Sequence, residues 1–475
     1  MAKYEKTTIN VRNYYSDYLT NYFNSETEAS DFLDQLPPEI LLHIFCFLNL
    51  DERLRLACVC KSWRDLIHNT PRLWRNSHLK LCCHLECLQW KRAFSSVKRF
   101  ANHFRELTIS CTHHNNHTGC KILAVEFRNL LLCIHEPVLT SLKITDLRLQ
   151  GSLSRTVSDI SAILTCMLSS LDRLKCFKMS SAQWPLQEGI KVMDTVLTVS
   201  RGTLQSLVID GFFEATSLAQ RPAEFDRVTN GILSLNRLTK LGIDYGLLTD
   251  EFVAALSRSH AGQISKVKLV ISGLKDCHLP KISHECWLKL TKACPKMKVA
   301  FNLDVWVLDY SQSNMDILDP ALPIYKLRLT YGLRYDVDFW NYDYASVKLK
   351  YIVKHFRHCL VKLEADIFNE EDDLLCSIYY NPEVIDGAVV HLVKQCYRLM
   401  QVKFSALFEN PEKVETAVKK VTQARLMREM RTSISKKRRN TEQASGPGTN
   451  GSNPQTSKKI KLQDTATWIL CKKCF

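Results

Sequence analysis

The sequence has no long hydrophobic run, few glycines and no leader-like start, and each shortage excludes a class of protein. Its most apolar stretch, residues 122–134, is interrupted by Glu126, Arg128 and Asn129, so no run of about 18 apolar residues could span a membrane. The first 24 residues carry no apolar block behind their basic residues, which argues against a secretory signal. With 15 glycines and 45% apolar residues in 475 positions, the composition is typical of a globular protein rather than a collagenous or disordered one.

Acidic residues are also scarce relative to basic ones, with 49 Asp and Glu against 64 Lys and Arg. Residues 431–475 hold ten Lys or Arg and two acids, a net +8 of the total +15, which leaves an ordinary +7 for the first 430 residues. That distribution gives little support to nucleic-acid binding by the body of the chain. The 19 cysteines form no regular framework and indicate reduced thiols, as in proteins of the cytoplasm and/or nucleus.

Catalytic and cofactor motifs are missing. The sequence contains no G-x-S-x-G, Walker A loop or H-E-x-x-H, and residues 446–451 spell G-x-G-x-x-G without a preceding strand. Zinc-type side chains crowd two short segments, but neither has a second pair at finger-like spacing, and a lone C-x-x-C at Cys471 and Cys474 is a half-site. The two segments contain Cys82, Cys83, His84 and Cys87, and Cys111, His113, His114, His117 and Cys120. We expect a non-catalytic protein without cofactor or metal, with a metal on the loop from Cys111 to Cys120 as the alternative.

The body of the chain repeats a short apolar pattern, hydrophobic at i, i+3 and i+5, nine times between residues 104 and 404, with a shifted tenth version at Met297, Val299 and Phe301. Successive middle positions lie 26 to 39 residues apart, which is the period of a solenoid. They are residues 107, 142, 177, 207, 241, 267, about 299, 327, 363 and 402. Amphipathic stretches between them predict helices over residues 121–135, 159–171, 189–199, 224–235, 250–259, 284–294, 344–356 and 382–396. One strand and one helix per unit, stacked side by side, would bury a continuous apolar seam.

This pattern resembles a leucine-rich-repeat domain of the long, helix-backed kind. The family usually places Asn or Cys three residues after the last core position of the strand, where the side chain ties down the turn. Here those positions hold Thr112, Leu147, Ala182, Phe212, Gly246 and Ser272. The resemblance therefore implies a solenoid with irregular curvature and uneven loops. An α/β domain of unrelated strands is the alternative interpretation.

Residues 31–79 predict a compact module of three helices. Pro37 and Pro38 suit the first turn of a helix, Asp51 is expected to cap a second helix, and a third begins near Trp63. The first helix is apolar over a wide face, with Ile40, Ile44 and Leu48 on one side and Leu41 and Phe45 on the next. So much apolar surface on about 50 residues is more than the module can cover, which suggests that a partner covers part of it.

The order of residues in this module resembles the F-box across its whole length: Leu36-Pro37, Glu39-Ile40-Leu41, Ile44-Phe45, Leu48, Val59-Cys60, Trp63-Arg64 and Leu73-Trp74. The resemblance implies a docking module for a Skp-type adaptor, and through it a cullin-RING scaffold, in an SCF ubiquitin ligase. The family's adaptor-facing positions fall on Leu36, Pro37, Ile40, Leu41, Ile44, Leu48, Val59 and Cys60. Trp63 and Trp74 are expected to close the module's own core and join it to the next domain. A helical cap that seals the first repeat is the alternative.

The expected fold class is therefore α/β: a small three-helix F-box module followed by an irregular leucine-rich-repeat-like strand-helix solenoid. The expected segments are a polar lead at 1–30, the F-box at 31–79, the solenoid at 80–430 and a disordered basic tail at 431–475. The resemblance implies a non-catalytic substrate receptor of F-box-only or F-box/leucine-rich type, which binds a protein substrate for ubiquitination. An F-box-bearing scaffold whose partner is not degraded is the second interpretation, and a nucleic-acid-binding protein is the third.

Two surfaces of the expected receptor carry further candidate residues. If the strands form the inner face, the outward positions that could bind substrate are Lys143, Lys178, Asp210, Asp244, Lys268, Arg328, Glu364 and Lys403. The tail carries two basic groups, hereafter the tail clusters, formed by Lys436, Lys437, Arg438 and Arg439, and by Lys458, Lys459 and Lys461. Two such groups across a polar linker predict a nuclear-localisation signal, with a solvated charged tail or a nucleic-acid-adhesive arm as the alternatives.

Overall fold

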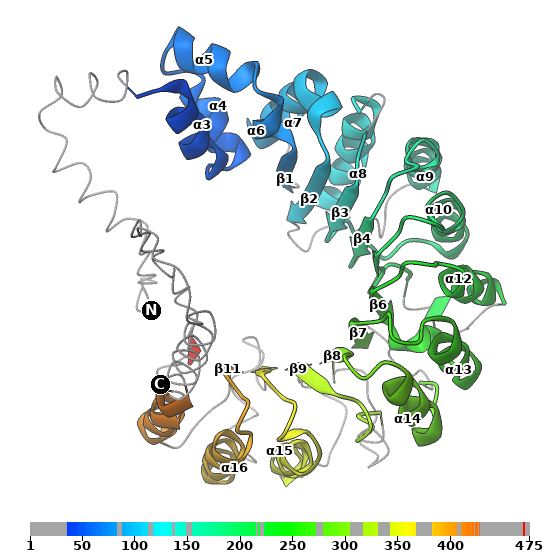
Figure 1. The fold of residues 1–475 in the computed structure, drawn as a ribbon, viewed down its shortest axis with the longest axis vertical. Coiled ribbons are helices and arrows are strands. Elements are labelled where there is room, and N and C mark those ends of the chain that lie inside the picture. The colour runs from blue at the N-terminus through cyan, green and yellow to red at the C-terminus, as the bar shows by residue number, and fades with distance from the viewer. Residues whose placement is uncertain are drawn as a thin grey trace, which may run out of the picture.

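The chain forms an open, curved solenoid in which strands line the inner side of the arc and helices the outer side (Figure 1). This computed structural model describes residues 36–82, 88–112, 117–134, 138–148, 154–214, 217–218, 223–271, 279–304, 317–330, 343–366, 382–405, 410–421, 423–425, 427 and 469–470. The expected α/β class is confirmed, with a small helical module at the N-terminal end of the arc.

The N-terminal module consists of four short helices: α3 (Pro38–Cys46), α4 (Leu50–Leu56), α5 (Lys61–His68) and α6 (Pro71–Trp74). Pro38 lies in the first turn of α3, as expected, because a missing N–H costs nothing there. The cap of α4 differs from expectation. Asn49 caps this helix and forms a reciprocal capping box with Glu52, whereas Asp51 lies inside the first turn.

A single parallel sheet runs through the whole solenoid in chain order, from β1 to β12. Each strand pairs only with its sequence neighbours, so every unit contacts the unit before and the unit after it. The strands are β1 (Asn76–Cys82), β2 (Glu106–Thr112), β3 (Ser141–Thr145), β4 (Cys176–Ser180), β5 (Ser206–Val208), β6 (Lys240–Asp244), β7 (Lys266–Ile271), β8 (Lys298–Asp304), β9 (Ile324–Thr330), β10 (Lys362–Asp366), β11 (Gln401–Ser405) and β12 (Ile469–Leu470). The ten predicted units correspond to β2–β11. Strand β1 starts directly after α6, so the expected boundary at residue 79 falls inside it.

The register of the sheet aligns the repeat positions that the apolar pattern identified. Leu107, Leu142, Phe177, Leu207, Leu241 and Val267 occupy one row across β2–β7. All six are buried, so the row forms the seam of the core. An irregularity between Val299 and Ala300 shifts this row, so that Phe301, not Val299, pairs with Leu327. The unit that the sequence pattern marked as shifted is therefore the place where the ladder is offset.

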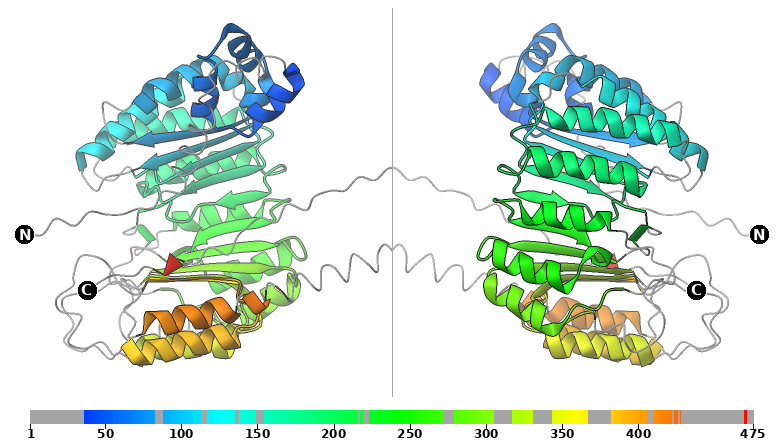
Figure 2. Two further views of the ribbon diagram at one scale, coloured as in Figure 1. Left: turned by 90° about the vertical axis from the view of Figure 1, so that its left-hand side faces the viewer. Right: turned by 90° about the vertical axis from the view of Figure 1, so that its right-hand side faces the viewer.

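The helices of the repeats form the outer layer, and Figure 2 shows strands and helices stacked unit upon unit from the N-terminal module to α16. They are α7 (Leu88–Phe100), α8 (His117–Leu132), α9 (Ser154–Ser169), α10 (Leu186–Val199), α12 (Glu224–Leu233), α13 (Asp250–Ser259), α14 (His284–Ala293), α15 (Asp343–Phe356) and α16 (Pro382–Gln395), with short 3-10 turns η1 (Ala101–His103) and η2 (Tyr245–Leu247). Eight of them match the predicted helices within a few residues. Leu147, Ala182 and Phe212, which replace the family's Asn or Cys, are fully buried, so apolar packing fills that position.

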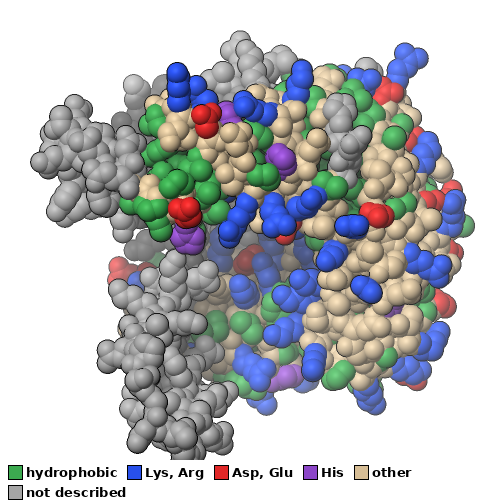
Figure 3. Space-filling model, turned by 45° about the horizontal axis from the view of Figure 1, so that its top comes forward, with side chains coloured by type: hydrophobic (Ala, Val, Ile, Leu, Met, Phe, Trp, Pro, Cys, Tyr) green, Lys and Arg blue, Asp and Glu red, His purple; other side chains and the backbone are tan. Residues whose placement is uncertain are grey.

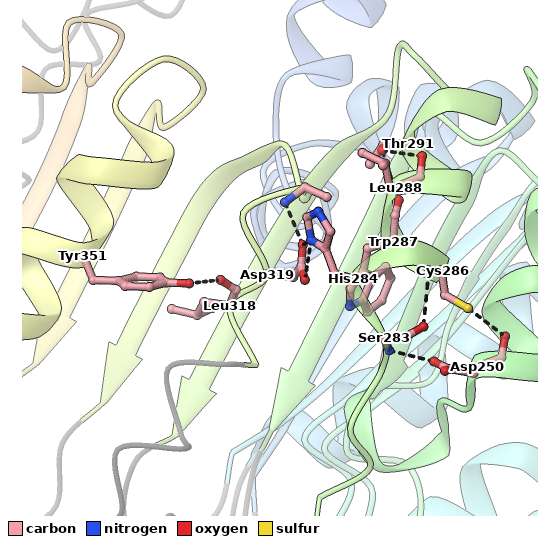
Figure 4. A network of polar contacts seen from close by, with 11 residues as sticks. Asp250, Ser283, His284, Cys286, Trp287, Leu288, Thr291, Leu318, Asp319 and Tyr351 are labelled. Atoms are coloured by element: carbon pink, nitrogen blue, oxygen red, sulfur yellow. Dashed lines mark hydrogen bonds and ion pairs between the residues drawn. The ribbon is translucent and has the colours of Figure 1, made fainter.

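A polar network ties neighbouring units together at the starts of α13 and α14 and before β9 (Figure 4). The Ser283 N–H donates to the Asp250 carboxylate at 2.8 Å, which links the starts of α13 and α14. His284 Nδ1 lies 2.9 Å from Asp319, whose same oxygen accepts from the Ala321 N–H at 2.7 Å. Together these contacts fix the stacking of units whose connecting loops differ in length.

Two further properties concern the helices and the thiols of the described residues. None of the helices in the described ranges is long and apolar enough to cross a lipid bilayer. Several cysteines of the described ranges are free thiols, among them the buried Cys111, Cys294 and Cys396.

Candidate functional site

A buried arginine organises the core of the N-terminal module. Arg53 Nε donates to the Phe45 carbonyl at 3.0 Å, and its two terminal nitrogens donate to the carbonyls of Cys46 and Leu73. Phe45 and Cys46 end α3, where carbonyls lack helical partners and favour a cation. Burial lowers the pKa of Arg53. This side chain therefore joins α3, α4 and α6, a role that the apolar pattern could not reveal.

Two tryptophans complete the core, as the sequence predicted. Trp63 packs edge-on against Phe45, with ring centroids 5.4 Å apart. Trp74 is fully buried, and its Nε1 donates to the Ile67 carbonyl at 3.0 Å. Its ring stacks on Phe100 at the end of α7, with centroids 3.7 Å apart and planes only 6° from parallel. The Trp74–Phe100 stack therefore fastens the helical module to the first helix of the solenoid.

Apolar side chains remain exposed on the outside of this module even though its core is complete. Ile40 and Ile44 are 48% and 41% exposed on the outward side of α3, and Phe47, next to the end of this helix, is 72% exposed. Val59, which follows α4, is 63% exposed. We call these four residues the module's apolar face. Large apolar groups concentrated on so few residues are typical of a protein-binding surface.

The eight predicted adaptor-facing residues divide by burial. Pro37, Ile40, Ile44 and Val59 are exposed, whereas Leu36, Leu48 and Cys60 are half-buried and pack against the core. Leu41 differs from expectation, because it is only 6% exposed and lies on the inward side of α3 with Phe45, one helical turn away. Phe47 was not predicted, although its place three residues after Ile44, on the same side of a helix, was a usable signal.

Seven of the eight predicted substrate-facing residues lie on the strand face opposite the seam, in two neighbouring rows, and Asp210 lies in the turn after β5. Lys143, Lys178 and Lys268 are half-buried; Lys143 and Lys178 are direct partners across β3 and β4. Arg328, Glu364 and Lys403 are partners across β9, β10 and β11, and the two basic residues are exposed. The strands that carry these six positions line the inner side of the arc in Figure 1, and their role in substrate binding stays a prediction.

Asp244, at the end of β6, and Asp210, in the turn after β5, are buried, at 2% and 5% exposure, and form a cluster with Lys268. Asp210 lies 2.5 Å from Lys268 Nζ, while both Asp244 oxygens accept from the Gly211 N–H at 2.9 and 3.0 Å. Gly211 has a φ of +64°, which a side chain would strain. Burial raises the pKa of Asp244 to about 8, against the opposing effect of the Gly211 N–H. These carboxylates hold a turn instead of presenting charge to a partner.

The structure also shows basic residues that sequence reasoning missed. In β6–β10, the residue just before each middle core position is a lysine, and we call these five residues the lysine ladder: Lys240, Lys266, Lys298, Lys326 and Lys362. Their recurrence at one repeat position was the available signal. The expected substrate-binding residues include one outward position per unit, and the lysine ladder occupies a second outward position.

Several predicted features lie wholly or partly outside the described residues. The tail clusters fall there, as do Cys83, His84 and Cys87 and the lone C-x-x-C. The loop from Cys111 to Cys120 is described only in part, and burial raises the pKa of the Cys111 thiol, against ligation. Within the described ranges, no three His, Cys, Asp or Glu side chains group as a metal site requires.

Comparison with known proteins agrees with the geometry of the module. A family model described as F-box-like matches residues 33–80. Human F-box only protein 33 is 21% identical over 348 residues, covering 62% of this chain and 59% of that protein. F-box/LRR-repeat protein 12 is 27% identical in mouse, covering 51% of this chain and 73% of that protein, and 25% identical in human, covering 70% and 96%.

These relatives also fit the solenoid. The match to F-box only protein 33 covers 62% of this chain, so it extends beyond the F-box-like module into the solenoid. This chain spans less than two thirds of the length of F-box only protein 33. The order of residues, the Trp-closed helical module and the family match lead to one conclusion: the chain carries an F-box-like domain at residues 33–80, joined to an open α/β solenoid.

Proposed function

We propose that this chain is the non-catalytic substrate-recognition subunit of an SCF ubiquitin ligase. The F-box-like module docks on a Skp-type adaptor, which joins the chain to a cullin-RING scaffold, and the inner face of the solenoid binds the protein to be ubiquitinated. The observation that carries the proposal is the apolar face, which stays exposed on a module whose own core is complete. Isopeptide bond formation takes place on a separate conjugating enzyme, and this chain supplies proximity.

The outward side of α3 and the residues after α4 form the proposed docking surface. Ile40 and Ile44 lie one turn apart on α3 and keep 48% and 41% of their surface exposed. Pro37, which precedes α3, and the half-buried Leu36 and Leu48 extend the same helix at its two ends. Hydrophobic side chains gather at the N-terminal end of the molecule in Figure 3. An adaptor surface that covers this face would remove it from water, which stabilises the complex.

The rigid connection to the solenoid supports the receptor role. The Trp74–Phe100 stack and the pairing of β1 with β2 leave no flexible linker between the module and the sheet. An adaptor bound to α3 is thereby held at a fixed distance from the inner face of the arc. Fixed geometry is what a receptor needs if it is to present one region of its partner repeatedly to the same enzyme.

The test is the double variant Ile40→Asp and Ile44→Asp, assayed by co-purification of adaptor and cullin. Interface hot spots typically contribute ~2 kcal/mol or more each, so two losses weaken binding about a thousandfold at ~1.4 kcal/mol per decade. Leu41 is left unchanged because it packs in the core. The matched control is Val125→Asp with Leu132→Asp, two similarly exposed apolar residues on α8.

The expected result is loss of adaptor and cullin from the α3 variant, an unchanged circular dichroism spectrum, and full retention by the α8 control. Retention of the adaptor by a folded α3 variant would refute the docking surface. The half-life of a protein that co-purifies with the solenoid in both variants separates a degradation receptor from a scaffold. If this half-life falls only when the adaptor is bound, the chain is a degradation receptor.

A further inference from the structure

The lysine ladder is a repeated, in-register feature of the inner face that the proposed docking to an adaptor does not use. Lys240 pairs with Lys266, and Lys266 with Lys298, across β6, β7 and β8. Lys326 and Lys362 are partners across β9 and β10, one row over because of the irregularity after Val299. Five consecutive units therefore present a lysine at the same repeat position.

The ladder places like charges closer together than a stable sheet favours. Neighbouring strands lie about 4.8 Å apart, well inside the Debye length of about 8 Å at physiological salt. Like charges on directly paired positions destabilise a sheet. Lys240, Lys266 and Lys298 are exposed, and no carboxylate in the described part of the chain forms an ion pair with them. An anion that bridges them would relieve this repulsion.

The surroundings of the ladder increase its positive potential. Lys143, Lys178 and Lys268 lie in the adjoining row. Among the described lysines of the two rows, Lys268 forms an ion pair with Asp210 and Lys326 forms one with Glu364. Figure 3 looks obliquely into the hollow that the strands line, and Lys and Arg side chains gather along it with few Asp or Glu. Clefts lined by one sign of charge focus the field and attract the opposite charge.

We infer that the lysine ladder binds an acidic, extended segment of a protein partner. Four strand spacings of about 4.8 Å give a stripe about 19 Å long, which matches about six residues of extended polypeptide at about 3.3 Å each. The inference rests on the proposed function in that the bound protein would be the ligase substrate. It names the chemistry of recognition, which the receptor role alone leaves open.

A polypeptide fits the ladder better than a single-stranded nucleic acid. Proteins that bind single strands combine a basic groove with aromatic side chains on which bases stack. Val208, Gly242 and Ala300 lie between the lysines of the row next to the ladder. Across β2–β8, no paired position of the ladder row or of this next row carries an aromatic residue. These small side chains let a peptide backbone approach the sheet closely, but a nucleic-acid base would find no aromatic ring to stack on.

The experiment measures binding of a defined acidic probe by fluorescence anisotropy. The probe is a labelled peptide of six consecutive Glu flanked by Gly-Ser, and its control carries six Gln. The protein is the full chain with the tail clusters changed to Gln, so that the basic tail does not bind the probe. The ladder variant is Lys240→Gln, Lys266→Gln and Lys298→Gln. The charge-matched control changes three exposed lysines of the outer helices, Lys292, Lys350 and Lys354, to Gln.

The Glu peptide is expected to bind with an affinity that falls as salt rises, and the Gln peptide is not. The ladder variant should bind at least ~10-fold more weakly, whereas the outer-helix control should stay within about twofold. The melting temperature of the ladder variant should not fall, because neutralisation removes repulsion. Equal binding by ladder variant and control would overturn the inference, as would preferential binding of a thymidine oligonucleotide of equal charge.

Adaptor co-purification in the same samples keeps the two proposals separate. If the Glu peptide binds through the ladder but no adaptor co-purifies, the ladder inference stands and the ligase function fails. If the adaptor co-purifies but the peptide binds no better than its Gln control, the ladder inference fails and the ligase function stands.

Discussion

The joint between the F-box-like module and the solenoid allows a quantitative prediction. Trp74→Ala and Phe100→Ala are each expected to lower the local stability of the joint by about 3–5 kcal/mol, because both rings are buried. The rings stack at 3.7 Å with planes 6° apart, so the pair should contribute a further ~0.5–1.5 kcal/mol beyond the burial of each ring. A double-mutant cycle isolates that coupling, since the double variant then loses less than the sum of the single losses.

The assay must report local stability, because a repeat protein whose units contact only their neighbours need not unfold in one step. Hydrogen exchange at the backbone amides of α6 and β1 gives the free energy of opening at the joint. Amides of β6–β8, five or more strands away, serve as the internal control. Phe100→Leu, which keeps an apolar side chain but abolishes the stack, should cost less than Phe100→Ala.

Two results would refute this reasoning. If the losses at the joint add within about 0.3–0.5 kcal/mol, the rings are not coupled and the stack does not fasten the module. If protection falls equally at β6–β8, stability is not transmitted from neighbour to neighbour as the sheet order implies. Either outcome would also weaken the idea that the joint holds an adaptor at a fixed distance from the inner face.

Three further predictions concern the seam, the buried carboxylates and the tail. Leu207→Asp buries an unpaired charge in the seam and should cost more than ~4 kcal/mol, whereas Val208→Asp on the inner face should change the melting temperature little; equal damage would refute the strand face. Burial raises the pKa of Asp244 to about 8, so the folded chain keeps a proton that the unfolded chain releases above pH 3.8. The free energy of unfolding should therefore fall by up to ~1.4 kcal/mol per pH unit from about pH 4 to 8. Asp244→Asn should abolish this pH dependence of the melting temperature. Changing the tail clusters to Gln should move a fluorescent fusion from nucleus to cytoplasm with an unchanged melting temperature, and an unmoved fusion would exclude an import signal.

The apolar repeat was predictable because it obeys two periodicities at once. Alternation along each strand fixed the seam, and the spacing of about 30 residues fixed the stacking, so the ten core strands and eight helices could be placed before the fold was known. Strand β1 was not predicted because its unit, residues 76–82, lacks the i, i+3, i+5 spacing that nine of the other ten units share. Its pairing with β2 is a tertiary contact that no local pattern contains.

The burial of Leu41 and Asp244 shows what linear patterns cannot decide. Leu41 and Ile40 are adjacent and equally apolar, and only the packing of α3 against Trp63 and Arg53 decides which of them faces the core. Asp244 occupies an outward strand position, yet the turn at Gly211 folds over it. In both cases the deciding group lies in another element, so the sequence around the residue carries no signal for its burial.

The lysine ladder shows the converse, a signal that becomes readable only once the register is known. In the printed sequence, the five lysines stand at uneven intervals of 26, 32, 28 and 36 residues, and any one of them resembles a solvated surface charge. The parallel register converts their shared repeat position into adjacency across paired strands in two sets, from Lys240 to Lys298 and between Lys326 and Lys362, with Lys326 paired to Ala300. The irregularity after Val299 offsets the stripe without ending it, because the lysine of each later unit is displaced along with its strand. Charge at a fixed repeat position in a solenoid is therefore best counted by row of the sheet. A partner that lies across the strands contacts residues that are neighbours in the sheet, even where they are far apart along the chain.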